Sequence, residues 1–233
     1  FYTYLVTPSG ISNLFMQNFG IMSWSGFERL QFNNRGDKVL LYNPNGLLEL
    51  FDFDRCTGLF SNENRISWET FRNSDQYWEA EFSPNDQLLY VNTCSSPYTL
   101  YQFDMTSSTI LSSRAVIDSI SYPFSGGGDM KLAPDGKIYE ARWFNDGLNS
   151  AFPYPDSLYN QYNTNLSVIN SPNNVGAACN FQPFSFYLGG NRTYCGLPNN
   201  PNYDFEALGG SICDTLNFPN NLTYCRPPFY DIK

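Results

Sequence analysis

The sequence predicts an all-β fold: a partial β-propeller with about three to four antiparallel, four-stranded blades of a larger ring. Three observations predict this fold. They are a composition dominated by strand and turn residues, segments in which apolar and polar residues alternate, and a repeat with a fixed period.

The composition favours short strands joined by many turns. Aromatic residues make up 18% of the 233 residues and charged residues only 15%, and the chain holds 17 Gly and 15 Pro. Aromatic residues are enriched in strands, whereas Gly and Pro mark turns. Hydrophobic residues reach 42%, enough to build a core, so a disordered chain is not expected.

The repeat defines the blades. Phe32, Phe82 and Leu132 lie 50 positions apart (82 − 32 and 132 − 82), and each stands in a strand that alternates apolar and polar residues. A turn and a second strand follow each time, and the units cover residues 29–42, 79–91 and 129–139. Units of about 40–50 residues with four strands are typical of propeller blades.

A third strand follows at residues 50–54 and 100–104 in the first two units. Its equivalent in the third unit comes late, at 166–170, which predicts an inserted loop at about 144–163. Residues 1–7 look like the third strand of an earlier blade whose first half is missing.

Closed propellers need about four to eight blades. We therefore expect residues 1–205 to form only the C-terminal blades of a ring, completed from elsewhere. We expect residues 206–233 to be a tail or the start of a linker, because the repeat pattern breaks there.

Charge and hydropathy limit the classes of partner that the chain can be expected to bind. The formal net charge is −9, so neither nucleic acid nor anionic lipid is an expected partner. No apolar run is long enough for a membrane helix, so no membrane insertion is expected. The chain opens without Met or a basic leader, as a mature chain, a trimmed chain or a fragment would. The predicted location is extracellular or on the outer cell surface.

The cysteine count favours disulfides in an oxidising compartment. The six cysteines are Cys56, Cys94, Cys179, Cys195, Cys213 and Cys225. They allow 15 pairings, which the sequence alone does not resolve. Our working hypothesis joins the pairs that are near in sequence, Cys179–Cys195 and Cys213–Cys225, and leaves Cys56–Cys94.

The absence of histidine excludes several kinds of site. The chain has no His, so Ser-His-Asp and Cys-His catalysis and His-containing metal sites are ruled out. We expect no catalytic residue, no cofactor and no metal ion. Asn- and Asp-rich turns offer oxygen ligands for Ca²⁺, but hydrogen-bonded turns are the favoured interpretation.

Glu79 and Glu81 are two positions apart on one strand and so share a face. One interpretation is a carboxylate pair of the kind glycosidases use. The favoured one is charge pairing between blades, because the repeat places Arg29, Asp129 and Lys131 at or near equivalent positions.

The aromatic residues and one glycine segment also carry structural expectations. The aromatic residues are expected mainly in blade cores, with carbohydrate stacking as the alternative. Trp143 and Tyr154, in or beside the insertion, are the candidates for exposure. The glycines at 126–128 are expected to let an inner strand pack closely against a neighbour.

The chain resembles the secreted and cell-surface β-propeller proteins of Bacteroidetes that are linked to type IX secretion. The resemblance covers about residues 1–200 and rests on the ordered segments 81–85, 89–91, 100–104, 130–139, 166–173, 176–181 and 196–199. Two features depart from the pattern: residues 33–36 replace the usual Ser-Pro-Asp-Gly turn, and Glu140 takes the place of an apolar residue.

The resemblance implies architecture and location, but little about activity. It also implies O-glycosylation at Asp-Ser/Thr followed by an apolar residue. The matching residues are Ser119, Ser157 and Thr215.

These observations predict a non-catalytic binding or structural module, not an enzyme, that acts in adhesion or in a secretion or surface complex. Its expected partners are a protein or glycan at the cell surface, or the remainder of its own polypeptide. The alternative is a propeller enzyme acting on glycans or lactones at the central channel. The channel discriminates between them, since an enzyme needs converging polar side chains and carboxylates with shifted pKa values there.

Overall fold

The computed structural model describes residues 1–7, 10–21, 26–68, 75–95, 97–121, 126–142 and 159–197. These residues form one two-stranded and three four-stranded antiparallel sheets. The first sheet pairs β1 (Tyr2–Thr7) with β2 (Gly10–Met16). The second contains β3 (Arg29–Phe32), β4 (Lys38–Asn43), β5 (Leu47–Asp54) and β6 (Leu59–Ser67). The third contains β7 (Tyr77–Phe82), β8 (Leu88–Thr93), β9 (Tyr98–Asp104) and β10 (Ala115–Ile120). The fourth contains β11 (Gly127–Leu132), β12 (Ile138–Arg142), β13 (Asn165–Ile169) and β14 (Phe181–Tyr187).

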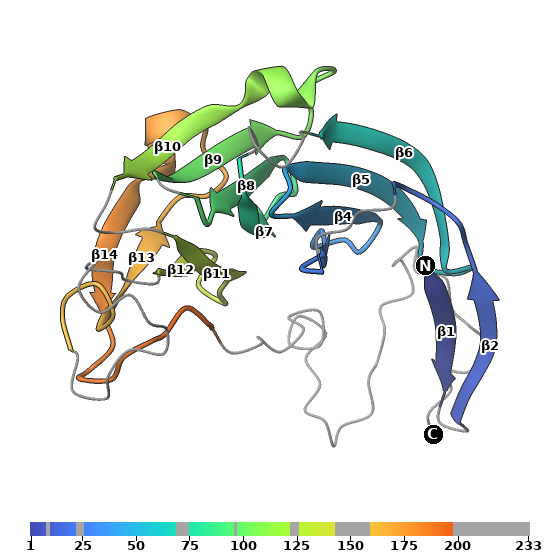
Figure 1. Cartoon of the computed structure of the whole chain (residues 1–233), viewed down its shortest axis with the longest axis horizontal. Coiled ribbons are helices and arrows are strands. Elements are labelled where there is room, and N and C mark those ends of the chain that lie inside the picture. Colours follow the sequence, from blue (N-terminus) through green and yellow to red (C-terminus); the bar gives the residue numbers. More distant parts are fainter. Residues whose placement is uncertain are drawn as a thin grey trace.

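The sheets follow one another around an open arc, as the blades of a propeller do (Figure 1). Within each four-stranded sheet the strands pair in chain order, and the first strand lies nearest the centre of the arc (Figure 1). The two short 3₁₀ turns, Ile110–Ser113 and Gly176–Cys179, lie outside this pattern. The predicted all-β, partial-propeller fold is therefore confirmed. Residues 206–233 and most of the predicted insertion lie outside the described residues.

The turns between the first two strands of each blade explain the repeat. A short backbone bond closes each turn, from Gly36 to Asn33, from Asp86 to Ser83 and from Gly136 to Ala133, at 2.9–3.0 Å. The third turn is one residue shorter, because Ala133 N–H bonds to the Lys137 carbonyl whereas Ser83 N–H bonds to that of Leu88. The period of 50 residues therefore holds for the inner strands and becomes 49 along the next strands.

That shorter turn explains the unusual position of Glu140. Met130 pairs with Glu140 as Ala80 pairs with Val91. Glu140 thus replaces a core valine, and it is 1% exposed.

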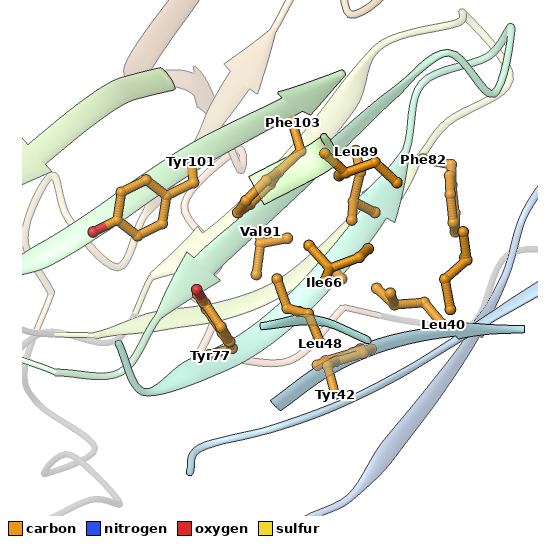
Figure 2. Close-up of a cluster of buried hydrophobic side chains, with 13 residues drawn as sticks. Leu40, Tyr42, Leu48, Ile66, Tyr77, Phe82, Leu89, Val91, Tyr101 and Phe103 are labelled. Carbon is orange, nitrogen blue, oxygen red and sulfur yellow. The ribbon is translucent and has the colours of Figure 1, made fainter. Parts of the chain in front are cut away.

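The hydrophobic core lies between successive blades. Figure 2 shows the cluster between the second and third sheets, where Leu40, Tyr42 and Leu48 face Phe82 and Leu89. A second cluster joins the third and fourth sheets and includes Met130, Tyr90 and Tyr98. In each cluster, apolar residues of an inner strand (Ala80 and Phe82, or Met130) pack on the preceding blade. The polar residues that alternate with them on each inner strand point to the opposite face, toward the axis of the arc.

The turn at residues 33–36 forms hydrogen bonds with the corresponding turn of the next blade. The Asp86 carboxylate accepts the backbone N–H groups of Asn34 and Arg35, at 2.8 and 3.2 Å, and the side-chain amide of Asn33, at 3.1 Å. Asp86 presents its carboxylate from a left-handed conformation, φ 60°. Successive blades are therefore also joined through their turns.

Gly127 and Gly128 allow the close approach expected for this glycine segment. A Cβ atom on Gly127 would lie 2.3 Å from the Asn92 side chain. One on Gly128 would lie 2.3 Å from the carbonyl oxygen of Cys195 and 2.5 Å from that of Ala141. Both contacts of Gly128 are with backbone, which does not move aside as a flexible side chain would.

We expect Gly128→Ala to destabilise the chain by about 2–3 kcal/mol, as overpacking of a tight contact does. Gly136→Ala is the matched control, because a Cβ there meets nothing within 4 Å. That control should cost about 1 kcal/mol, for its left-handed backbone alone. Chemical denaturation of both variants measures the difference, and equal losses would contradict the assigned contact.

Candidate functional site

Polar side chains from three inner strands converge on the axis of the arc in two layers. The first layer holds Arg29 of β3, Glu79 of β7 and Asp129 of β11. The second layer comes two residues later on each strand, and its members are Gln31, Glu81 and Lys131. The members of each layer lie 50 residues apart, because the inner strands repeat with that period. The two layers lie on the same face of these strands, because side chains two apart on a strand point to one side. The five charged residues predicted to join the blades thus lie together.

An arginine links all three blades in the first layer. Nη1 of Arg29 pairs with the Glu79 carboxylate and also with Oδ1 of Asp129, at 3.1 Å. The Tyr42 hydroxyl donates to Oε1 of Glu79 at 2.7 Å. The guanidinium of Arg29 also lies 5.0 Å from the ring centre of Trp78. Both oxygens of Glu79 therefore have partners, and its side chain is held in one place.

The second layer is centred on Glu81, which also receives a backbone hydrogen bond from Leu132. Gln31 donates to Oε1 of Glu81 at 3.2 Å, and the backbone N–H of Phe82 reaches the same oxygen at 3.2 Å. Lys131 influences the Glu81 carboxylate through its charge. Within the described part of the chain, the Lys131 ammonium makes no ion pair of 4 Å or less.

The environment shifts the pKa of both glutamates. Burial raises the pKa of Glu81 from 4.5 to about 7, although the charge of Lys131 opposes the shift. Burial also raises the pKa of Glu79, against the hydrogen bond from Tyr42 and the charge of Arg29. Burial alone would lower the pKa of Arg29, but the charges of Glu79 and Asp129 outweigh it and raise that pKa. Glu81 therefore exchanges a proton near neutral pH, as a general acid or base must.

Residues 193–197, called the strap below, bond to the first layer at Asp129. The carbonyl of Cys195 accepts the backbone N–H of Asp129 at 2.7 Å. The N–H of Leu197 donates to Oδ2 of Asp129 at 3.2 Å. Thr193 anchors the strap by donating its N–H to the carbonyl of Asn163 at 2.9 Å. Arg29 and this strap therefore each hold one oxygen of Asp129. The only signal of the strap in the sequence pattern is the glycine that it packs against, Gly128.

The cysteines correct the pairing hypothesis. Cys94, Cys179 and Cys195 are free thiols, so Cys179–Cys195 and Cys56–Cys94 are not formed. Cys56 is disulfide-bonded, and its partner lies outside the described residues. Nearness in sequence misleads here, because Cys179 is buried beside Tyr90 in the core between two blades.

The other predicted sites are spread over the chain. Ser119 is exposed on β10, and its hydroxyl donates to the carbonyl of Tyr98 at 3.1 Å. Its neighbour Asp118 pairs with Arg142 at 2.9 Å. Residues outside the described part of the chain are Ser157, Thr215, Cys213, Cys225, Trp143 and Tyr154. Within the described ranges, no three His, Cys, Asp or Glu side chains are grouped to hold a metal ion.

Sequence reasoning missed Tyr42 and Gln31. Tyr42 reads as a core aromatic, since only its hydroxyl reaches the polar layer. Gln31 is signalled by the repeat itself, as it lies 50 residues before Glu81.

No protein-family model matches the chain, and no curated protein does either. Solved structures that are similar to it include the following three. A protein from Lactobacillus plantarum has a TM-score of 0.44 and 19% identity over 72% of this chain and 43% of that one. A luciferin-regenerating enzyme has a TM-score of 0.42 and 12% identity over 68% and 47%. The periplasmic gluconolactonase of Pseudomonas aeruginosa has a TM-score of 0.41 and 13% identity over 83% and 47%.

The chain spans about half the length of these structures. Two of them are enzymes by name, which contradicts the prediction that a chain of this kind is not an enzyme. That prediction rested in part on the lack of histidine, which excludes only the mechanisms that need an imidazole.

Proposed function

We propose that the chain is part of a propeller enzyme that hydrolyses a cyclic ester, a lactone, at the central channel, with Glu81 as the general base. The observation that carries the proposal is the pKa of Glu81 at about 7, beside a lysine without an ion pair in the described residues. Polar groups that converge from the inner strands, with carboxylates whose pKa is raised, support this proposal.

The proposed reaction starts when ionised Glu81 takes a proton from a water molecule. The hydroxide oxygen forms a bond with the carbonyl carbon of the lactone, and the negative charge passes to the carbonyl oxygen. The Lys131 ammonium stabilises that charge. When the intermediate collapses, the ring C–O bond breaks and the leaving oxygen takes the proton back from Glu81. One water molecule is consumed and one hydroxy acid is formed.

A lactone fits these residues better than a glycan. Glycoside hydrolysis needs a second carboxylate that is free to act as nucleophile or base. In Glu79, Tyr42 and Arg29 hold both oxygens. Ester hydrolysis requires one group that can take up and release a proton and one positive charge near the carbonyl oxygen. Glu81 and Lys131 would supply these, so glycan hydrolysis remains the second choice.

We expect Glu81→Gln to lower kcat/KM for lactone hydrolysis at least ~100-fold, as the loss of a general base does. In the unmodified chain, kcat/KM should rise with pH and level off above about 7, because the ionised form of Glu81 is the base. A pH-stat assay on a panel of five- and six-membered lactones measures both.

Lys131→Met should also lower kcat, whereas the control Lys137→Met in the nearby turn should not. No hydrolysis above background for any lactone, or full activity of Glu81→Gln, would refute the proposal. Hydrolysis of aryl glycosides instead of lactones would favour the second choice.

Location and partners remain predictions. Among the described residues, no helix has the length and apolar character to cross a membrane. An extracellular or cell-surface location, a surface protein or glycan as partner, and the kinship with Bacteroidetes propellers are proposals that rest on the sequence.

A further inference from the structure

We propose that the substrate is a hydroxylated lactone, the cyclic ester of a sugar acid, and that Arg29 and Asp129 bind its hydroxyl groups. These two residues of the first layer would then determine specificity. The inference rests on the proposed lactone hydrolysis at Glu81 and names the class of lactone.

Arg29 has hydrogen-bond donors left for a ligand. A guanidinium carries five N–H donors. Arg29 uses Nη1, which bonds to Glu79 and to Asp129. Among the described residues, Nε and Nη2 of Arg29 donate no hydrogen bond. The side chain is also 35% exposed, so a ligand can reach these donors.

Neighbouring residues fix the plane of the Arg29 guanidinium. Its centre lies 5.0 Å from the ring centre of Trp78, in the stacked arrangement that arginine favours on aromatic rings. The pairing of β7 with β8 shifts between Tyr77 and Glu79, so Trp78 stands in a β-bulge. Bulges re-aim side chains beside functional sites. Arg29 thus presents its remaining donors in a fixed direction.

Asp129 offers the complementary acceptor. Each oxygen of a carboxylate can accept two hydrogen bonds. Oδ1 accepts one from Arg29 at 3.1 Å, and Oδ2 accepts one from the N–H of Leu197 at 3.2 Å. The side chain of Asp129 is 25% exposed. Both of its oxygens therefore keep room for a bond from a ligand.

The adjacent opposite charges decide which chemical group fits. Asp129 would repel a phosphate or carboxylate at Arg29, and Arg29 would repel a cation at Asp129. An apolar group would cover both charges without replacing their bonds to water. A hydroxyl group both donates and accepts. It can therefore donate to Asp129 and accept from Arg29 at the same time.

The spacing of the layers matches a ring of this kind. Lys131 lies two residues after Asp129 on β11, and two residues of a strand span about 7 Å. In a six-membered sugar-acid lactone, some hydroxyl groups lie across the ring from the carbonyl. When the carbonyl oxygen meets Lys131, these hydroxyl groups would point along the axis to the first layer.

Two lactones with the same ring test the selectivity. One is the six-membered lactone of a hexonic acid, and the other is δ-valerolactone, which has no hydroxyl group. Each kcat/KM is divided by the uncatalysed rate constant of that lactone. The normalised value should be roughly 10–100-fold higher for the hexonic lactone, because hydrogen bonds to charged groups contribute this much.

A conservative variant assigns this preference to Arg29. Arg29→Lys keeps a positive charge beside Glu79 and Asp129 but loses the planar fork of donors. It should lower the ratio of the two normalised values at least ~10-fold. Arg65→Lys is the matched control, since Arg65 pairs with Glu49 and Glu63 on the outer part of the same blade. The control should leave the ratio unchanged.

Binding without turnover separates this inference from the proposed function. The lactam of the same hexonic acid has an amide in place of the ester and is not hydrolysed in the assay. Titration calorimetry should show saturable binding of this lactam to the full chain. Arg29→Lys should weaken the binding at least ~10-fold, and Arg65→Lys should not.

Equal normalised values for the two lactones would overturn the inference, as would lactam binding that is absent or insensitive to Arg29→Lys. If both lactones are hydrolysed alike and the activity depends on Glu81, only the recognition of hydroxyl groups is wrong. If the lactam binds through Arg29 but neither lactone is hydrolysed, the first layer does bind hydroxylated rings, and the role of Glu81 as a base is wrong.

Discussion

Replacing Arg142 by methionine should destabilise the chain by about 3–5 kcal/mol, the usual cost of leaving a buried charge without its partner. Arg142 and Glu140 are 5% and 1% exposed, and Nε of Arg142 donates to Oε2 of Glu140 at 2.8 Å. Nη2 of Arg142 also pairs with Asp118 at 2.9 Å. Without the arginine, Glu140 would keep only its neutral donors, Asn92 and Tyr98. Urea denaturation near neutral pH measures the loss.

The removal of both charges provides the matched control. Glu140 occupies the position that Val91 fills in the preceding blade, so Glu140→Leu combined with Arg142→Met should recover most of the stability. Tyr98→Phe should be added, because the Tyr98 hydroxyl would otherwise lose both of its partners. If the triple variant is no more stable than Arg142→Met alone, the loss of stability does not come from the unpaired charge of Glu140.

The sequence predicted the inner strands and the charged residues on them. Alternation fixes which side chains share a face, and the 50-residue period fixes which strands are equivalent. Together these two regularities placed Arg29, Glu79 and Asp129 at corresponding positions before any contact was known. What they do not reveal is how deeply each residue is buried. The pKa of Glu81 depends on that burial, and so does its suitability as a base.

Other features depend on contacts that the repeat does not encode. The disulfide hypothesis failed because pairing follows distance in space, and Cys179 is enclosed between blades. Glu140 looked like an irregularity, since its polar partners lie 42 and 48 residues away in the chain. The strap at Cys195 crosses β11 from outside the repeat and leaves only a glycine, Gly128, as its trace in the pattern.

The pH dependence of stability should isolate the charge of Glu81. The fold raises the pKa of this carboxyl from 4.5 to about 7, so the folded chain holds one more proton than the unfolded chain between these values. The contribution of Glu81 to stability is therefore complete below pH 4.5, falls as the pH rises and is lost above about pH 7. Near 1.4 kcal/mol per pH unit, the change amounts to roughly 3 kcal/mol at most.

Glu81→Gln removes this titration, since an amide stays neutral. The free energy of unfolding of the variant relative to the unmodified chain should increase between pH 5 and pH 8. Glu28→Gln is the control, because Glu28 is exposed just before β3 and has no place in the buried layers. A difference that stays flat with pH would mean that Glu81 ionises as freely as a surface carboxyl. The general-base proposal would then lose its physical foundation.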